Sequence, residues 1–185
     1  MPPCKERTDP SRNAFACECM NRVDRDLALC KTDTNMITPH TSSQNIKLAV
    51  DAAIFTIQNG ELCLLLIQMN KSPFEKMWAI PGGLIEENET TLTAAQRILK
   101  DQTGLTHVFL EQLKTFDETT RDPRGRVVSV AHYALVPDEH VDLTTTDKYL
   151  DVRWWPIKKL PPLAYDHKAI AREALSRIKN KIQYT

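Results

Sequence analysis

Apolar and polar residues follow a strand pattern at the start of the ordered part of the chain. Segment 46–57 (IKLAVDAAIFTI) is a β-rich apolar run, and Asn59-Gly60 follows it as a hairpin turn signal. Segment 61–69 (ELCLLLIQM) is apolar almost throughout. This pattern predicts a returning strand that is buried on both faces.

A helical period begins after a glycine-rich loop. In segment 90–105 the apolar residues recur at helical spacing on one predicted face, formed by Leu92, Ala95 and Leu99. Thr90 or Thr91 can cap this helix, and Gly104 is its C-terminal stop. We therefore expect a central helix from about residue 91 to residue 103.

The rest of the chain adds strands and a closing helix. Apolar runs at 108–116, 127–136 and 152–157 predict strands, and a loop with Pro and Gly is expected at 117–126. Asp166 is the expected N-cap of a last helix with an apolar stripe at Ile170, Ala174, Leu175 and Ile178. The pattern predicts a mixed α+β fold.

Residues 1–45 show no sustained periodicity and are rich in Pro, Ser, Thr, Asn and Asp. We expect a disordered N-terminal extension there, followed by one domain over residues 46–185. Four of the five cysteines lie in this extension, and no CxxC pair is present. Free thiols of a reduced compartment are favoured over a metal site, and Cys63 is expected in the core.

Composition excludes some classes of function. The 24 basic and 24 acidic residues give a formal net charge of zero, which argues against a chain-wide footprint for nucleic acid or an anionic membrane. No apolar run reaches the length of about 18 residues that is needed to span a bilayer. The first residues have no apolar core of a signal peptide. We therefore predict a cytoplasmic protein with no membrane partner.

The segment from Gly82 to Leu105 carries the most specific motif. Gly83, Glu89, Arg97 and Gly104 are spaced as in the pattern G-x5-E-x7-R-E-U-x-E-E-x-G-U, where U is aliphatic. The chain resembles the Nudix superfamily in this frame and in the preceding WAIPGG. The resemblance implies a Nudix fold, an α/β/α sandwich with a mixed central sheet.

The chemistry of that family depends on carboxylates of one helical face. Glycines such as Gly82 and Gly83 let the backbone approach a diphosphate, and carboxylates at i, i+3 and i+4 hold Mg²⁺ or Mn²⁺ against it. By the same resemblance, Glu89 and Arg97 form a structural salt bridge between the loop and the helix.

The three carboxylate positions depart from the family pattern. They are Ile98, Asp101 and Gln102 in this chain, so that Asp101 is the single remaining carboxylate and the candidate metal ligand. Ile98 has no lone pair, and Gln102 is a neutral, weaker ligand. Acids elsewhere could assist Asp101 or could be solvated loop residues: Glu86, Glu87, Asp117, Glu118 and Glu139. If lost carboxylates alone silence the site, changing Ile98 and Gln102 together to Glu should raise activity.

A second stretch, residues 120–136 (TRDPRGRVVSVAHYALV), resembles Nudix proteins that handle ADP-ribose. Arg121, Arg124 and Arg126 are candidates for phosphate contacts, because a guanidinium group suits phosphate oxygens, or they belong to a solvated basic hairpin. Trp78 and Phe116 could stack on adenine or could belong to the core.

Segment 154–182 resembles the end of the sensor domain in Nudix-related transcriptional regulators of NAD metabolism. In those proteins a winged helix follows, whereas this chain ends at Thr185, so we expect no nucleic acid to be bound by this chain alone. The favoured hypothesis is a domain that senses ADP-ribose or a related nucleoside diphosphate derivative with little or no hydrolysis. The alternative is an active Mg²⁺-dependent ADP-ribose pyrophosphatase. The resemblance also implies a homodimer.

Overall fold

The computed structural model describes residues 45–137 and 143–183. The predicted extension, apart from its last residue, lies outside the described residues. The same is true of Glu139 and of four cysteines: Cys4, Cys17, Cys19 and Cys30. Cys63 is buried in the core, as predicted.

A tight hairpin opens the domain, as the Asn-Gly pair predicted. Strand β1 (Lys47–Gln58) and strand β2 (Glu61–Met69) are antiparallel, with Gln58 opposite Glu61. The turn residues Asn59 and Gly60 have φ angles of 51° and 76°. Two positive φ angles match the right-handed twist of the strands, which explains the preference for Asn-Gly at this point.

The hairpin lies within a mixed sheet whose main path is β3-β2-β1-β6-β5. Strand β4 also pairs with β1, and β7 pairs with β2. The β1 and β6 strands are parallel, whereas the other pairings are antiparallel. The remaining strand bounds are Trp78–Ala79 for β3, Gly82–Leu84 for β4, Glu111–Phe116 for β5, Val127–Leu135 for β6 and Tyr149–Pro156 for β7.

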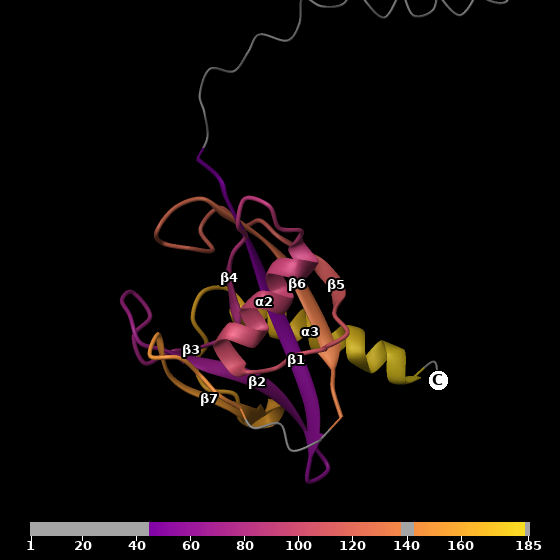
Figure 1. Cartoon of the computed structure of the whole chain (residues 1–185). Helices are drawn as coiled ribbons and strands as arrows, with labels where there is room; N and C mark the ends of the chain where they lie inside the picture. Colours follow the sequence, from indigo (N-terminus) through magenta and orange to yellow (C-terminus); the bar gives the residue numbers. More distant parts are fainter. Residues whose placement is uncertain (1–44, 138–142, 184–185) are drawn as a thin grey trace, which may run out of the picture. The chain divides into compact units, whose positions relative to one another are not determined.

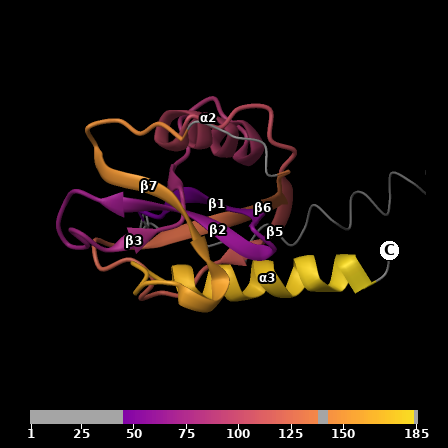
Figure 2. The ribbon, with the colours of Figure 1, turned by 90° about the horizontal axis from the view of Figure 1, so that it is seen from below.

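Two helices cover opposite faces of this sheet, with α2 (Thr91–Thr103) on one side and α3 (His167–Gln183) on the other (Figures 1 and 2). A short 3-10 helix, Ile157–Lys159, follows β7. Each face of the sheet has its own apolar cluster, in which side chains of the covering helix take part. The predicted α+β class and the α/β/α sandwich with a mixed sheet are confirmed.

Helix α2 begins and ends where the sequence indicated. Thr90 accepts a hydrogen bond from the Thr93 backbone, and Gly104 ends the helix with a φ of 77°. The predicted buried face is only partly right, because Leu92 is 40% exposed. Ala95 and Leu99 are buried as predicted, and the complete buried face consists of Ala94, Ala95, Ile98, Leu99, Gln102 and Thr103.

Helix α3 buries three of the four residues of its predicted stripe and half-buries Leu175. Asp166 lies directly before the helix, as expected, and both of its carboxylate oxygens pair with Arg121. No helix among the described residues is long and apolar enough to cross a membrane.

Candidate ligand-binding site

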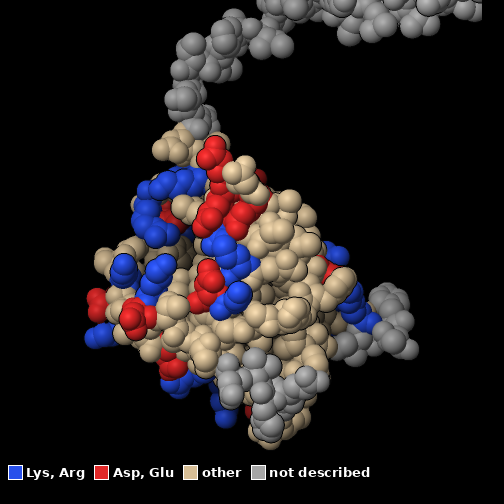
Figure 3. Space-filling model, in the orientation of Figure 1, with Lys and Arg blue, Asp and Glu red and all other residues tan. Residues whose placement is uncertain are grey.

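A cavity of about 290 Å³ lies where β1, β4 and the loop before β6 meet. This volume is near the lower end of the range for small-molecule sites, about 300–1,000 Å³. The loop carries Arg121, Asp122, Arg124 and Gly125 into the lining. Figure 3 shows Lys and Arg side chains grouped over this loop, next to a group of acidic side chains.

Charged and apolar side chains both line the cavity. The charged lining residues are three basic and two acidic: Lys47, Arg121, Arg124, Asp51 and Asp122. The apolar and aromatic lining includes Ile67, Met69, Tyr149 and Tyr165. Burial raises the pKa of both tyrosines, so their hydroxyl groups stay protonated at neutral pH.

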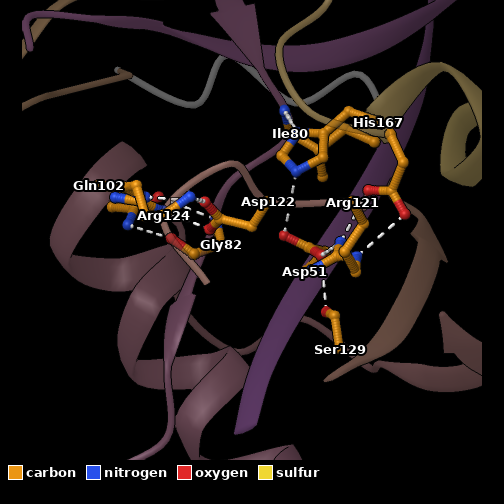
Figure 4. A network of polar contacts seen from close by, with 10 residues as sticks. Asp51, Ile80, Gly82, Gln102, Arg121, Asp122, Arg124, Ser129 and His167 are labelled. Atoms are coloured by element: carbon orange, nitrogen blue, oxygen red, sulfur yellow. Dashed lines mark hydrogen bonds and ion pairs between the residues drawn. The ribbon is translucent and has the colours of Figure 1, made fainter. Parts of the chain in front are cut away.

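Asp51 is the centre of a buried polar network (Figure 4). Its carboxylate accepts hydrogen bonds from Arg121 at 3.1 Å and from Ser129 at 2.6 Å. Arg121 also donates two hydrogen bonds, at 2.9 and 2.8 Å, to Asp166. Burial alone would raise the pKa of Asp51, but the hydrogen bonds and charges around it prevail and lower that pKa. Asp51 is therefore a buried anion.

His167 completes the network in a defined tautomer. The backbone N–H of Ile80 donates to His167 Nδ1 at 2.9 Å, so Nδ1 carries no proton. The Nε2 atom then bears the hydrogen and faces Asp51 Oδ1 at 3.4 Å. His167 thus links the end of β3 to the start of α3 and to Asp51.

Arg124 and Asp122 form a second, more accessible pair. Arg124 donates to both carboxylate oxygens of Asp122, at 3.0 and 2.7 Å, and these hydrogen bonds lower the pKa of Asp122. The Arg124 side chain is 58% exposed, and its guanidinium lies 5.4 Å from the centre of the Tyr165 ring. Tyr165 has a φ of 53°, a backbone conformation that costs about 1 kcal/mol or more in a bulky residue.

Gly82 and Gly83 form the part of the cavity that touches α2. A Cβ atom at Gly82 would lie 2.1 Å from Asp51 Oδ1, so this position admits glycine alone without movement of the network. A Cβ atom at Gly83 would lie 3.2 Å from Ile98 Cδ1. The backbone of β4 is therefore enclosed between the Asp51 network and helix α2.

Two of the three predicted carboxylate positions point into this contact. Ile98 is 3% exposed and packs with the apolar cluster under α2. Gln102 is 7% exposed, and its amide donates to the carbonyl of Gly82 at 2.9 Å and accepts from the N–H of Gly82 at 3.1 Å. Asp101, by contrast, is exposed.

The residues at these positions do not fit a divalent cation. No group of three or more His, Cys, Asp or Glu side chains in the described part of the chain could hold a metal ion. Ile98 offers no donor atom, and the Gln102 oxygen is already hydrogen-bonded. The loop acids are exposed as well: Glu86, Glu87, Asp117 and Glu118.

Glu89 and Arg97 join the loop to the helix. Arg97 donates to Glu89 through Nε at 2.5 Å and through Nη2 at 2.7 Å, and it also reaches the carbonyl of Leu84 at 3.3 Å. The hydrogen bonds from Arg97 lower the pKa of Glu89 to about 2. Glu86 lies 3.5 Å from the same guanidinium.

Of the other residues predicted to contact a ligand, some line the cavity and some do not. Arg121 and Arg124 line the cavity, but the Arg121 side chain is 4% exposed and is held by two carboxylates. Trp78 and Phe116 belong to the apolar core on the α3 side and are not among the lining residues. Arg126 donates to the carbonyl of Asp117.

Sequence reasoning missed most of the polar network. Asp51, Ser129 and His167 were not singled out, and Asp166 was expected only as a helix cap. A charged residue inside an apolar strand, as in LAVDAAIF, was the available signal, because an unpaired buried carboxylate is rare. The two cavity tyrosines carried no comparable signal.

Comparisons with known proteins agree with this architecture. The "ADPR responsive transcriptional repressor NtrR" of Acinetobacter baylyi is 33% identical over 150 residues, which are 75% of this chain and 56% of the repressor. An "ADP-ribose pyrophosphatase" of Methanocaldococcus jannaschii is 33% identical over 110 residues, 60% of this chain and 64% of the enzyme. This chain thus spans less than two thirds of the length of either curated relative.

Among solved structures, the NUDIX domain of Shewanella oneidensis NrtR complexed with ADP ribose is 34% identical to this chain, with a TM-score of 0.67. The match covers 71% of this chain and 88% of that one. The sequence model of the NUDIX domain matches residues 47–178, and this chain belongs to the NUDIX domain family.

Proposed function

We propose that this domain binds ADP-ribose or a related nucleoside diphosphate derivative as a sensor, with little or no hydrolysis. The observation that carries the proposal is the contrast at β4. The glycine backbone still borders a cavity that charged and aromatic side chains line, whereas the neighbouring helix presents Ile98 and Gln102 as packing groups. The likeness to an ADPR-responsive repressor and to a NUDIX domain complexed with ADP ribose supports this choice of ligand.

The lining residues suggest contacts for the ligand. The diphosphate is expected near Gly83, Lys47 and the exposed guanidinium of Arg124, because these groups offer backbone approach and positive charge. The rings of Tyr149 and Tyr165 suit contact with a flat ring of the ligand. Arg121 is assigned a positioning role, since two carboxylates already share its donors.

The alternative is a working hydrolase that cleaves ADP-ribose with Mg²⁺ or Mn²⁺. The exposed carboxylate of Asp101 and the similarity to an ADP-ribose pyrophosphatase favour it. Nudix hydrolases typically use divalent metal ions, which several oxygen ligands must hold. The donor set around Asp101 argues against efficient catalysis.

Two measurements test the proposal. Calorimetric titration with ADP-ribose in the presence of a chelator should show binding, and Arg124→Met should weaken it. Incubation with ADP-ribose and Mg²⁺ or Mn²⁺, followed by quantification of AMP, should show no turnover at ordinary enzyme rates. Turnover that Asp101→Ala abolishes would establish the hydrolase instead, and absence of both binding and turnover would refute both functions.

A further inference from the structure

Gln102 makes a closed pair of hydrogen bonds with one backbone residue. Its Nε2 donates to the carbonyl of Gly82 at 2.9 Å, while its Oε1 accepts from the N–H of Gly82 at 3.1 Å (Figure 4). The pairing needs one donor and one acceptor on the same side chain, which an amide supplies. The reverse orientation of the amide would place donor against donor and acceptor against acceptor.

Gly82 is the point at which helix α2 and the Asp51 network meet. On one side, Gln102 holds both polar backbone groups of Gly82. On the other side, Asp51 lies so close that no Cβ atom would fit. Gly82 also lines the cavity, so its position determines the shape of the cavity floor.

A carboxylate cannot reproduce this arrangement. Glutamate has the same shape as glutamine and could still accept from the N–H of Gly82. Its second oxygen would face the carbonyl oxygen of Gly82 without a hydrogen between them, so the two acceptors would repel each other. A protonated glutamic acid would again have a donor, and the contact would be restored.

We propose that Gln102 is a positioning residue that holds the floor of the cavity in its binding shape without a metal ion. This inference rests on the proposed function, because its main consequence is ligand affinity. A backbone that is already held in its binding conformation raises affinity, because less conformational entropy is lost when the ligand binds. The amide thereby takes over, for binding, the position of a carboxylate in the family's motif.

The test compares three variants with the unmodified chain by calorimetric titration with ADP-ribose and a chelator. Gln102→Glu should bind about 5- to 100-fold more weakly at pH 8, the range expected for an unsatisfied buried polar group. Gln102→Met removes both hydrogen bonds to Gly82, and the contact with the Tyr149 hydroxyl, without adding charge, so it should also bind weakly at pH 8. Gln96→Glu places the same charge on the exposed part of α2 and should bind normally.

The outcomes separate the two proposals. If the unmodified chain binds and Gln102→Met binds equally well, the positioning role is refuted while the proposed function stands. If Gln102→Glu binds as tightly as Gln96→Glu at pH 8, the hydrogen-bond pair is not the cause. If the unmodified chain does not bind, the proposed function fails. Hydrogen exchange of the backbone amides of Gly82–Leu84 then tests the positioning role of Gln102 alone. Faster exchange in Gln102→Met than in Gln96→Glu supports that role, and equal exchange overturns it.

Discussion

Replacing Arg121 by Met should destabilise the domain strongly, and the size of the effect can be estimated from the Asp51 network. Arg121 donates one hydrogen bond to Asp51 and two to Asp166. Its side chain is 4% exposed and that of Asp51 is 7% exposed. Methionine has a similar length but no charge, so the variant leaves Asp51 as a buried anion with Ser129 and His167 as its remaining donors.

Removal of one partner from a buried ion pair costs about 3–5 kcal/mol, because the other charge remains uncompensated. Domains of this size are stable by about 5–15 kcal/mol, so this loss is a large fraction of the total. With a urea dependence of about 1–3 kcal/mol per molar, the unfolding midpoint should fall by about 2 M. Three tryptophans in the chain allow the transition to be followed by fluorescence.

The stability that Arg121→Met removes should depend on pH. In the unmodified chain the pKa of Asp51 is lowered, so its contribution is present above the unfolded pKa of about 3.9 and is lost as pH falls further. Without Arg121, one of the influences that lower the pKa of Asp51 is lost, so this pKa is higher in the variant than in the unmodified chain. The difference in stability between the two proteins should therefore be largest at neutral pH and should shrink as acid protonates Asp51.

The same loop provides a matched control. Arg126→Met removes an exposed hydrogen bond to the backbone carbonyl of Asp117 and leaves no carboxylate unpaired, so it should cost no more than about 1 kcal/mol. Combining Arg121→Met with Asp51→Asn should recover part of the loss, because no buried anion is then left unpaired. Equal urea midpoints for the two arginine variants, or a loss of stability that does not shrink at acid pH, would refute this account of the network.

Three further predictions concern the loop and the helix. Glu89→Gln should make the thermal midpoint depend less on pH at acid pH. In the unmodified chain the Glu89 carboxylate has a pKa of about 2, so it stabilises the fold above its unfolded pKa of about 4.5 and loses that effect as pH falls to 2. Gly82→Ala should lower the free energy of unfolding in urea by about 1–3 kcal/mol. Gly83→Ala should lower it less, because the new Cβ at Gly82 meets Asp51 whereas the one at Gly83 meets the end of Ile98. Ile98→Glu with Gln102→Glu should cost about 3 kcal/mol or more in urea unfolding, whereas Gln96→Glu should be neutral.

The elements of the fold could be predicted because their signals are local. Asn59-Gly60 determines a turn by its own backbone preferences, and Thr90 with Gly104 bounds a helix through its end groups. The buried face of α2 could not be read with equal accuracy. Leu92 suits a core by composition, yet it lies in the first turn of the helix and is 40% exposed.

The polar network could not be predicted because its members are close only in the folded chain. Asp51 meets Arg121 and Ser129 across separations of 70 and 78 positions. The sequence identified Arg121 as a cation suited to phosphate, but the identity of its partners depends on the parallel pairing of β1 with β6 and on the start of α3. No periodic pattern reports such pairings.

Ile98 and Gln102 show how the same letters can be read in two ways. In the sequence they are losses, since neither supplies the carboxylate that the motif requires. In the structure each makes contacts that a carboxylate could not make: Ile98 packs against Gly83 in an apolar cluster, and Gln102 binds both polar groups of Gly82. Replacing Ile98 and Gln102 by glutamate would thus remove these contacts, whether or not the new carboxylates could bind a metal ion. A gain in hydrolysis would require new polar surroundings for both side chains as well as the carboxylates themselves.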